Sequence, residues 1–195
     1  INNIKLSNGS NGSKNLDLSF GNYYGNHDYY IGINKLDTDG ISAMNDSPSE
    51  NDDDGYENQS IISKYGYIIN DNFSIKGSLR YSSSFLHYDE VTAGRTDKNN
   101  STDDTELSYS LKFLSDFGKF KNTIMYNYTD IERATKTYTN ASKNYYGYRD
   151  ALNFIGEYNF NLDTKIIYGF DNEFDRAKFQ KDWPTDYLES DEEIY

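Results

Sequence analysis

The sequence has no cysteine and only two prolines, two methionines and one tryptophan among its 195 residues. The lack of cysteine excludes a disulfide framework and thiol chemistry, but it does not assign a compartment. No apolar run approaches the ~18 residues of a transmembrane helix, which excludes such a helix. Basic residues are few, because 19 Lys and Arg stand against 32 Asp and Glu. The net charge of −13 disfavours nucleic acid as a partner, since its phosphates would be repelled.

Aromatic residues are abundant instead, with 20 tyrosines and 11 phenylalanines. The mean hydropathy of −0.90 is low. It is nevertheless compatible with a membrane barrel, in which only every second residue of a strand must be apolar. The chain does not begin at Ile1 with the charged region, apolar region and cleavage site of a signal peptide. We therefore expect that a signal peptide was removed or that the N-terminus is missing.

The clearest pattern lies between Gly55 and Asp89. Apolar and aromatic residues occupy most odd positions from Phe73 to Phe85, whereas serine, lysine and arginine occupy the even ones. This period of two predicts a long strand with one apolar and one polar face. A weaker alternation precedes it, and Asn70-Asp71-Asn72 predicts a tight turn of residues that tolerate positive φ.

Similar alternation recurs along the chain and predicts about eight strands in all. Polar stretches that begin at Thr38, Glu90, Arg133 and Ala177 predict long loops. They alternate with tight turns, so all long loops fall at one end of the sheet. Besides the central hairpin, the predicted strands are 16–22, 28–36, 105–116, 120–131, 148–160 and 165–175.

These features predict an all-β protein, an antiparallel up-and-down meander that is part of a transmembrane β-barrel with short periplasmic turns and long external loops. A soluble β-sandwich or adhesin domain is the alternative, although its strands are usually shorter. Tyrosines near strand ends suit interfacial girdles, although β-propensity also explains them. They are Tyr65, Tyr67, Tyr88, Tyr126, Tyr128, Tyr146 and Tyr148.

Two acidic segments open toward the same predicted end of the sheet. Asp52-Asp53-Asp54 lies in the first long loop, and Tyr88-Asp89 begins the next one. Carboxylates from neighbouring loops can converge on a divalent cation, which takes several oxygen ligands. A solvated acidic loop is the alternative.

Catalytic motifs are scarce, and we expect no enzyme. His27 and His87 are the only histidines, and no Gly-x-Ser-x-Gly elbow, zinc-type His pairing or Gly-rich phosphate loop occurs. An Asp-His protease built on rim loops is the alternative from another class. Trp183-Pro184 could touch a ligand or merely anchor a loop.

Several segments in order along the chain form a familiar series. They are Ile1-Asn2-Asn3-Ile4-Lys5, 37–43, 54–58, 79–82, Tyr88-Asp89, 126–133 and 168–174. In their order and spacing over nearly the whole chain, rather than in any single motif, they resemble the cobalamin-receptor branch of the TonB-dependent outer-membrane receptors.

The resemblance implies a fragment, because such receptors hold a plug inside a barrel of about 22 strands. Residues 1–14 would be the end of the plug and a flexible connector, and residues 15–195 a partial barrel. A complete eight-strand barrel is the rival interpretation, but the acidic end of the chain lacks a closing strand's alternation. The family would supply a further strand between 16–22 and 28–36, so we expect the up-and-down alternation to fail there.

The resemblance also implies a function, namely import of a scarce large ligand, cobalamin, across the bacterial outer membrane with energy from the TonB complex. An iron-siderophore or haem receptor is the alternative within the superfamily. Membrane lipid and the TonB complex would be partners, the latter through regions absent here. Calcium would be bound by Asp52, Asp54, Tyr88 and Asp89, and further ligands are expected at Asp37 or Asp39 and at Asp97 or Asp103.

Overall fold

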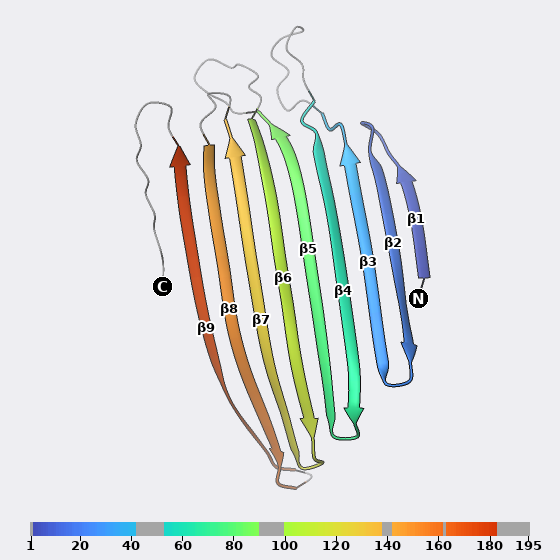
Figure 1. Ribbon diagram of the computed structural model, residues 1–195, viewed down its shortest axis with the longest axis vertical. Helices are drawn as coiled ribbons and strands as arrows, with labels where there is room; N and C mark the ends of the chain where they lie inside the picture. The colour runs from blue at the N-terminus through green and yellow to red at the C-terminus, as the bar shows by residue number, and fades with distance from the viewer. Residues whose placement is uncertain (1, 42–52, 90–99, 138–141, 162, 183–195) are drawn as a thin grey trace.

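The described part of the chain forms one antiparallel sheet of nine strands that follow one another in sequence order (Figure 1). This computed structural model describes residues 2–41, 53–89, 100–137, 142–161 and 163–182. In these ranges no helix is long and apolar enough to cross a membrane. The strands are β1 (Asn2–Asn8), β2 (Lys14–Tyr24), β3 (His27–Thr38), β4 (Tyr56–Asn70), β5 (Phe73–Tyr88), β6 (Asn100–Asp116), β7 (Phe120–Lys136), β8 (Ser142–Asn159) and β9 (Lys165–Asp182).

The predicted difference between the two ends of the sheet is confirmed. Short connections join β2 to β3, β4 to β5, β6 to β7 and β8 to β9, and all four lie at the lower end in Figure 1. The other ends of β3 to β8 lie at the upper end, together with the tight turn between β1 and β2. The expected failure of the up-and-down alternation before His27 is wrong, because β2 and β3 form an ordinary hairpin within it.

The strand count is nine rather than eight, because Asn2–Asn8 pairs with β2. The flexible connector expected after this segment is a tight turn closed by backbone hydrogen bonds, in which Gly9 N donates to Ser13 O at 2.8 Å. Asn11 and Gly12 adopt positive φ angles of 54° and 63°, as Asn and Gly do readily. Assignment of residues 1–14 to the end of a plug stays a prediction.

The strands also extend further toward the loop end than expected. β6 begins at Asn100 instead of Thr105, β7 continues to Lys136, and β8 begins at Ser142. In these extensions polar residues occupy both faces, so the period of two disappears although the backbone ladder continues. The sequence pattern therefore marks only the part of each strand that has an apolar face.

The predicted tight turn between β4 and β5 is confirmed, but none of its residues needs a positive φ. Asn70 Oδ1 instead accepts hydrogen bonds from the backbone N–H groups of Asn72 and Phe73, at 2.9 and 3.0 Å. Such an Asx turn lets the side chain satisfy backbone donors.

Residues paired across antiparallel strands share a face, so the register divides the sheet into two faces. One row across five strands consists of Ile75, Phe113, Ile124, Phe154 and Phe170. We call the side that contains this row the apolar face. It also carries Ile4, Leu6, Leu16, Leu18, Phe20, Ile31, Ile33, Ile61, Leu79, Leu107, Leu111, Leu152 and Ile166.

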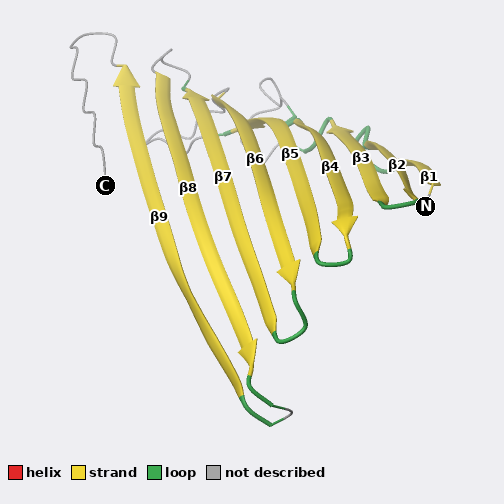
Figure 2. Cartoon of the chain, turned by 60° about the horizontal axis from the view of Figure 1, so that its bottom comes forward, coloured by secondary structure: helices red, strands yellow, loops and turns green. Residues whose placement is uncertain are grey.

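The opposite side, which we call the polar face, carries the row Arg80, Ser108, Thr129, Arg149 and Asp175. The described residues form a single layer (Figure 2). Large side chains of the apolar face are therefore exposed, and the only buried hydrophobic residue in the described ranges is Ala151. A soluble sandwich would cover such a face with a second layer.

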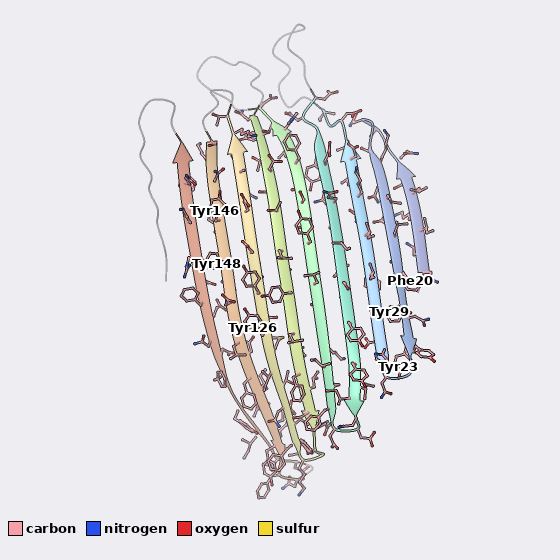
Figure 3. The ribbon with its side chains drawn as sticks, in the orientation of Figure 1. Phe20, Tyr23, Tyr29, Tyr126, Tyr146 and Tyr148 are labelled. Atoms are coloured by element: carbon pink, nitrogen blue, oxygen red, sulfur yellow. The ribbon has the colours of Figure 1, made fainter. Side chains whose placement is uncertain are left out.

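Aromatic side chains gather toward the short-turn end of the sheet (Figure 3). Ring pairs there include Phe20 with Tyr29 and Phe120 with Tyr158, with centroids 5.7 and 4.5 Å apart. Of the tyrosines expected in girdles, Tyr65 and Tyr67 belong to this end of β4. The others are Tyr126 and Tyr128 in the middle of β7, Tyr146 and Tyr148 in the loop-end half of β8, and Tyr88, which ends β5 on the polar face.

Candidate functional site

The backbone brings the two predicted acidic segments to the same place at the loop end. Tyr56 pairs with Leu86, and beyond this pair the backbone N–H of His87 donates to the Gly55 carbonyl at 2.9 Å. Asp54 therefore lies just before the first residue of β4. It is next to Tyr88, the last residue of β5, and to Asp89, which follows it. Both aspartates are half-buried, and one carboxylate oxygen of Asp89 is shielded from solvent.

Gly40 packs against this segment with a φ of 75°, and a side chain at this position would collide with the Asp54 carbonyl. Only glycine fits such a close backbone approach. The backbone just after β3 thus lies against the backbone at Asp54.

The other acidic residues considered as metal ligands are dispersed. Asp39 lies against Gly12, at the β1–β2 turn, where its carboxylate occupies the space that a residue 12 side chain would need. Asp37 and Asp103 lie on the apolar face, opposite Glu57 and Phe85.

Asp52 and Asp97 fall outside the described residues. Within those residues no group of three or more His, Cys, Asp and Glu side chains could hold a metal ion. Calcium binding by Asp52, Asp54, Tyr88 and Asp89 therefore stays a prediction, of which the structure supports only the backbone proximity of the last three.

The polar face carries ordered ion pairs. Arg133 donates from Nε and Nη2 to the two carboxylate oxygens of Asp104, at 2.6 and 3.0 Å. Arg149 makes the same two-pronged contact with Asp175, at 2.6 and 2.7 Å, and reaches Glu173 at 3.2 Å. These bidentate contacts fix the planes of both groups. Hydrogen bonding to Asp104 raises the pKa of Arg133.

At the short-turn end, Lys121 and Asp116 form an exposed ion pair of 2.8 Å. The hydrogen bond from Lys121, followed by one from the Gly118 backbone N–H, lowers the pKa of the Asp116 carboxyl. This pair closes the β6–β7 hairpin on the polar face, and exposed pairs of this kind contribute little to stability.

Side-chain amides extend the polar network across the strands. Asn127 donates to Asn153 at 3.2 Å, and Asn153 donates to Asp171 at 2.8 Å. Near the other edge, Asn34 donates to Asp17 at 2.5 Å. The polar face is thus built to meet water or a polar partner.

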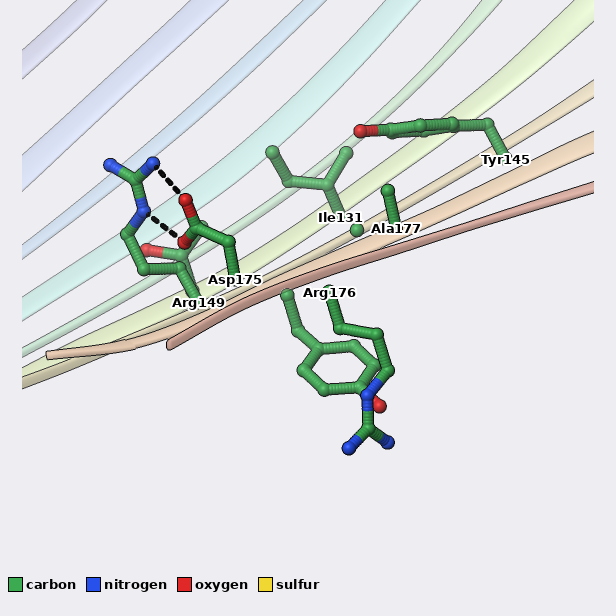
Figure 4. A pocket seen from close by; sticks show the side chains of 9 residues that line it. Ile131, Tyr145, Arg149, Asp175, Arg176 and Ala177 are labelled. Atoms are coloured by element: carbon green, nitrogen blue, oxygen red, sulfur yellow. Dashed lines mark hydrogen bonds and ion pairs between the residues drawn. The ribbon is translucent and has the colours of Figure 1, made fainter. Parts of the chain in front are cut away.

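A hollow of about 430 Å³ opens on the polar face of β7, β8 and β9 (Figure 4). Figure 4 shows Ile131, Tyr145, Arg149 and Asp175 on the same side of the sheet. The Tyr145 ring lies over Gly147. A Cβ atom at residue 147 would be only 3.0 Å from the Tyr145 hydroxyl oxygen. The hollow combines an apolar floor with a charged pair, which suits recognition of a polar ligand or protein segment.

The chemistry of the two histidines does not favour catalysis. His27 lies at the short-turn end, where its Nδ1 is 2.6 Å from the Tyr65 hydroxyl and its ring stacks on Tyr67. His87 lies at the loop end, with its ring edge against Phe85 at 4.7 Å. They are at opposite ends of the sheet and form no pair.

No protein-family model matches the sequence, and no curated protein matches it.

Proposed function

We propose that this chain is part of the transmembrane β-barrel of a bacterial outer-membrane receptor that imports a scarce large ligand with TonB-supplied energy. The observation that carries the proposal is the exposed apolar face of a long antiparallel meander. Lipid is the partner that such a face requires, and the polar face would then line the barrel interior.

The size of the apolar face supports lipid as this partner. Nine strands spaced by about 4.8 Å make a sheet ~38 Å wide. The apolar stretch Leu107–Phe113 rises by ~20 Å at about 3.4 Å per residue. Width times length gives an apolar area on the order of 800 Å². This area exceeds the ~300–600 Å² of the largest apolar patches on soluble monomers.

The shape of the sheet also supports a barrel wall. Strand length grows from 7 residues in β1 to 18 in β9, and the short-turn ends step downward along the sheet (Figure 1). Barrels require such a stagger between successive strands. The short turns would face the periplasm and the long connections the outside.

The ligand rests on the resemblance alone, which implies cobalamin and a calcium ion at the external loops. The mechanism would be binding rather than chemistry, with energy reaching a plug through regions that this chain does not contain. A siderophore or haem receptor has the same architecture, so the ligand must be measured.

The test is cobalamin binding to outer membranes from cells that express the full gene, with calcium and after chelation. Wild type should bind cobalamin more tightly with calcium. Asp54→Ala and Asp89→Ala should each lose this dependence and weaken binding about tenfold or more, since each removes an oxygen ligand. Asp71→Ala, an exposed carboxylate at the short-turn end, should behave like wild type.

Two outcomes would contradict parts of the proposal. Failure to bind cobalamin in any condition would remove the ligand and the calcium site, and iron chelates would be tested next. Peptide cleavage that disappears in His87→Ala would favour a rim protease. A soluble adhesin domain should stay monodisperse without detergent, whereas a barrel fragment with open strand edges should aggregate.

A further inference from the structure

Arg176 in β9 lies on the apolar face. The register places it beside Tyr148, which in turn pairs with Asp130. Figure 4 shows its guanidinium on the opposite side of the sheet from Arg149 and Asp175. Arg176 therefore takes no part in the ion pairs of the polar face.

The guanidinium is held by aromatic rings rather than by a counter-ion. Its central carbon lies 4.8 Å from the centroid of the Tyr148 ring and 5.3 Å from that of Phe174. The Nε–H group is buried and donates to no acceptor among the described residues, where Arg176 also forms no ion pair. The rings therefore orient the guanidinium, but no carboxylate of the described residues forms an ion pair with it. A guanidinium has five N–H donors, which can bind an anionic ligand.

Three carboxylates lie on this face of β7 and β8, namely Asp130, Glu132 and Asp150. Asp150 accepts a hydrogen bond from the Tyr126 hydroxyl, and Asp130 accepts one from Tyr128 at 3.4 Å. Lys178 lies two residues further along β9 on the same face and adds a second positive charge.

The position of Arg176 along β9 is equally informative. Toward the short-turn end, Phe174 and Phe170 continue the apolar face, whereas Lys178 and Gln180 follow toward the loop end. Arg176 is thus at the boundary where hydrocarbon gives way to headgroups if this face meets lipid.

We propose that Arg176 binds the phosphate of a lipid headgroup in the outer leaflet, with Tyr148 and Phe174 orienting the guanidinium. The inference rests on the proposed membrane location. Two oxygens of a phosphate can accept hydrogen bonds from the two arms of the guanidinium, and they place a negative charge in direct contact with it, as no ion pair among the described residues does. Lys178 would add attraction to the same anionic surface.

The test measures lipid binding to the protein expressed from its full gene and purified in neutral detergent. Micelles contain either a bisphosphorylated outer-leaflet glycolipid or the same lipid with its phosphates removed. Wild type should bind the phosphorylated lipid about tenfold more tightly than Arg176→Gln, as expected for a charge-assisted bidentate contact. Arg80→Gln, which removes an arginine from the polar face, should bind like wild type.

Arg176→Lys keeps the charge but not the fork, so it should bind with intermediate affinity and show that loss in the glutamine variant is not misfolding. Equal wild-type affinity for both lipids, or equal affinity of wild type and Arg176→Gln, would overturn the inference. Inorganic phosphate that binds as tightly as the lipid would overturn the assignment to a headgroup. Absence of wild type from the outer membrane would instead contradict the proposed function.

Discussion

Leu111→Arg should nearly abolish folded protein in the outer membrane. Leu111 lies in the middle of β6 on the apolar face, between Gly77 and Tyr126, and half of its side chain is exposed. If this face meets hydrocarbon, an arginine near the bilayer midplane costs about 2–4 kcal/mol. A cost of this size lowers the ratio of folded to unfolded protein by roughly 30-fold to 1000-fold at equilibrium. Membrane fractionation and the gel shift between unheated and heated samples would measure the loss.

Ser110→Arg is the matched control, because Ser110 is the neighbouring residue and lies on the polar face. It adds the same side chain to the same strand, where water or polar groups can receive it. We expect its membrane level to stay within about twofold of wild type, as for substitutions of less than ~0.5 kcal/mol. Two results would mean that lipid does not cover the apolar face. One is an equal loss of folded membrane protein in both variants, and the other is a wild-type level of folded protein in Leu111→Arg.

The second large effect is expected from Ser108→Pro. Ser108 pairs with Arg80 on one side and Thr129 on the other, so β6 is an interior strand. Proline removes a backbone donor from the ladder and is nearly excluded from central strands. The carbonyl that loses its donor costs about 1–3 kcal/mol. The ratio of folded to unfolded protein in membranes should fall by about 5-fold to 150-fold. Ser108→Ala should remain close to wild type.

Asp71→Pro is the positional control for this prediction. Asp71 follows Asn70 in the β4–β5 turn, where the hydrogen bonds come from Asn72 and Phe73 instead. Proline is favoured at the second position of such turns, so Asp71→Pro should fold almost normally. If it were as damaging as Ser108→Pro, the sheet edges or the turn would be misassigned.

Much of the fold could be predicted because hairpin register follows from a short turn. Arg149 and Asp175 are equidistant from the β8–β9 turn, and Arg133 and Asp104 are equidistant from the β6–β7 turn. Both ion pairs could therefore have been found by pairing residues outward from predicted turns. Sequence reasoning missed them because it did not apply this register.

Register across the long connections could not be predicted in this way. No turn fixes the pairing of β5 with β6, for example, and only matching of apolar faces places Ile75 opposite Phe113. The strand extensions were missed for a related reason: polar residues on both faces leave no periodic signal. β1 was missed although Ile4 and Leu6 alternate with polar residues, because the resemblance assigned this segment to the end of a plug. Of the candidate calcium ligands, only the neighbourhood of Asp54, Tyr88 and Asp89 follows from strand order.

Arg176 illustrates a different limit. Its alternation with Phe174 indicates the face on which it lies, but the buried Nε and the ring contacts depend on rotamers that no sequence pattern specifies.

The most direct measurement of membrane contact uses the absence of cysteine from the chain. Residues Leu107 to Phe113 would be replaced by cysteine one at a time and spin-labelled in the outer membrane, and their accessibility to oxygen and to a polar nickel complex would be compared. We predict oxygen maxima at residues 107, 109, 111 and 113, which share the apolar face, and nickel maxima at the positions between them. Odd positions shielded from both reagents would reveal a protein layer over this face and would contradict a barrel wall in contact with lipid.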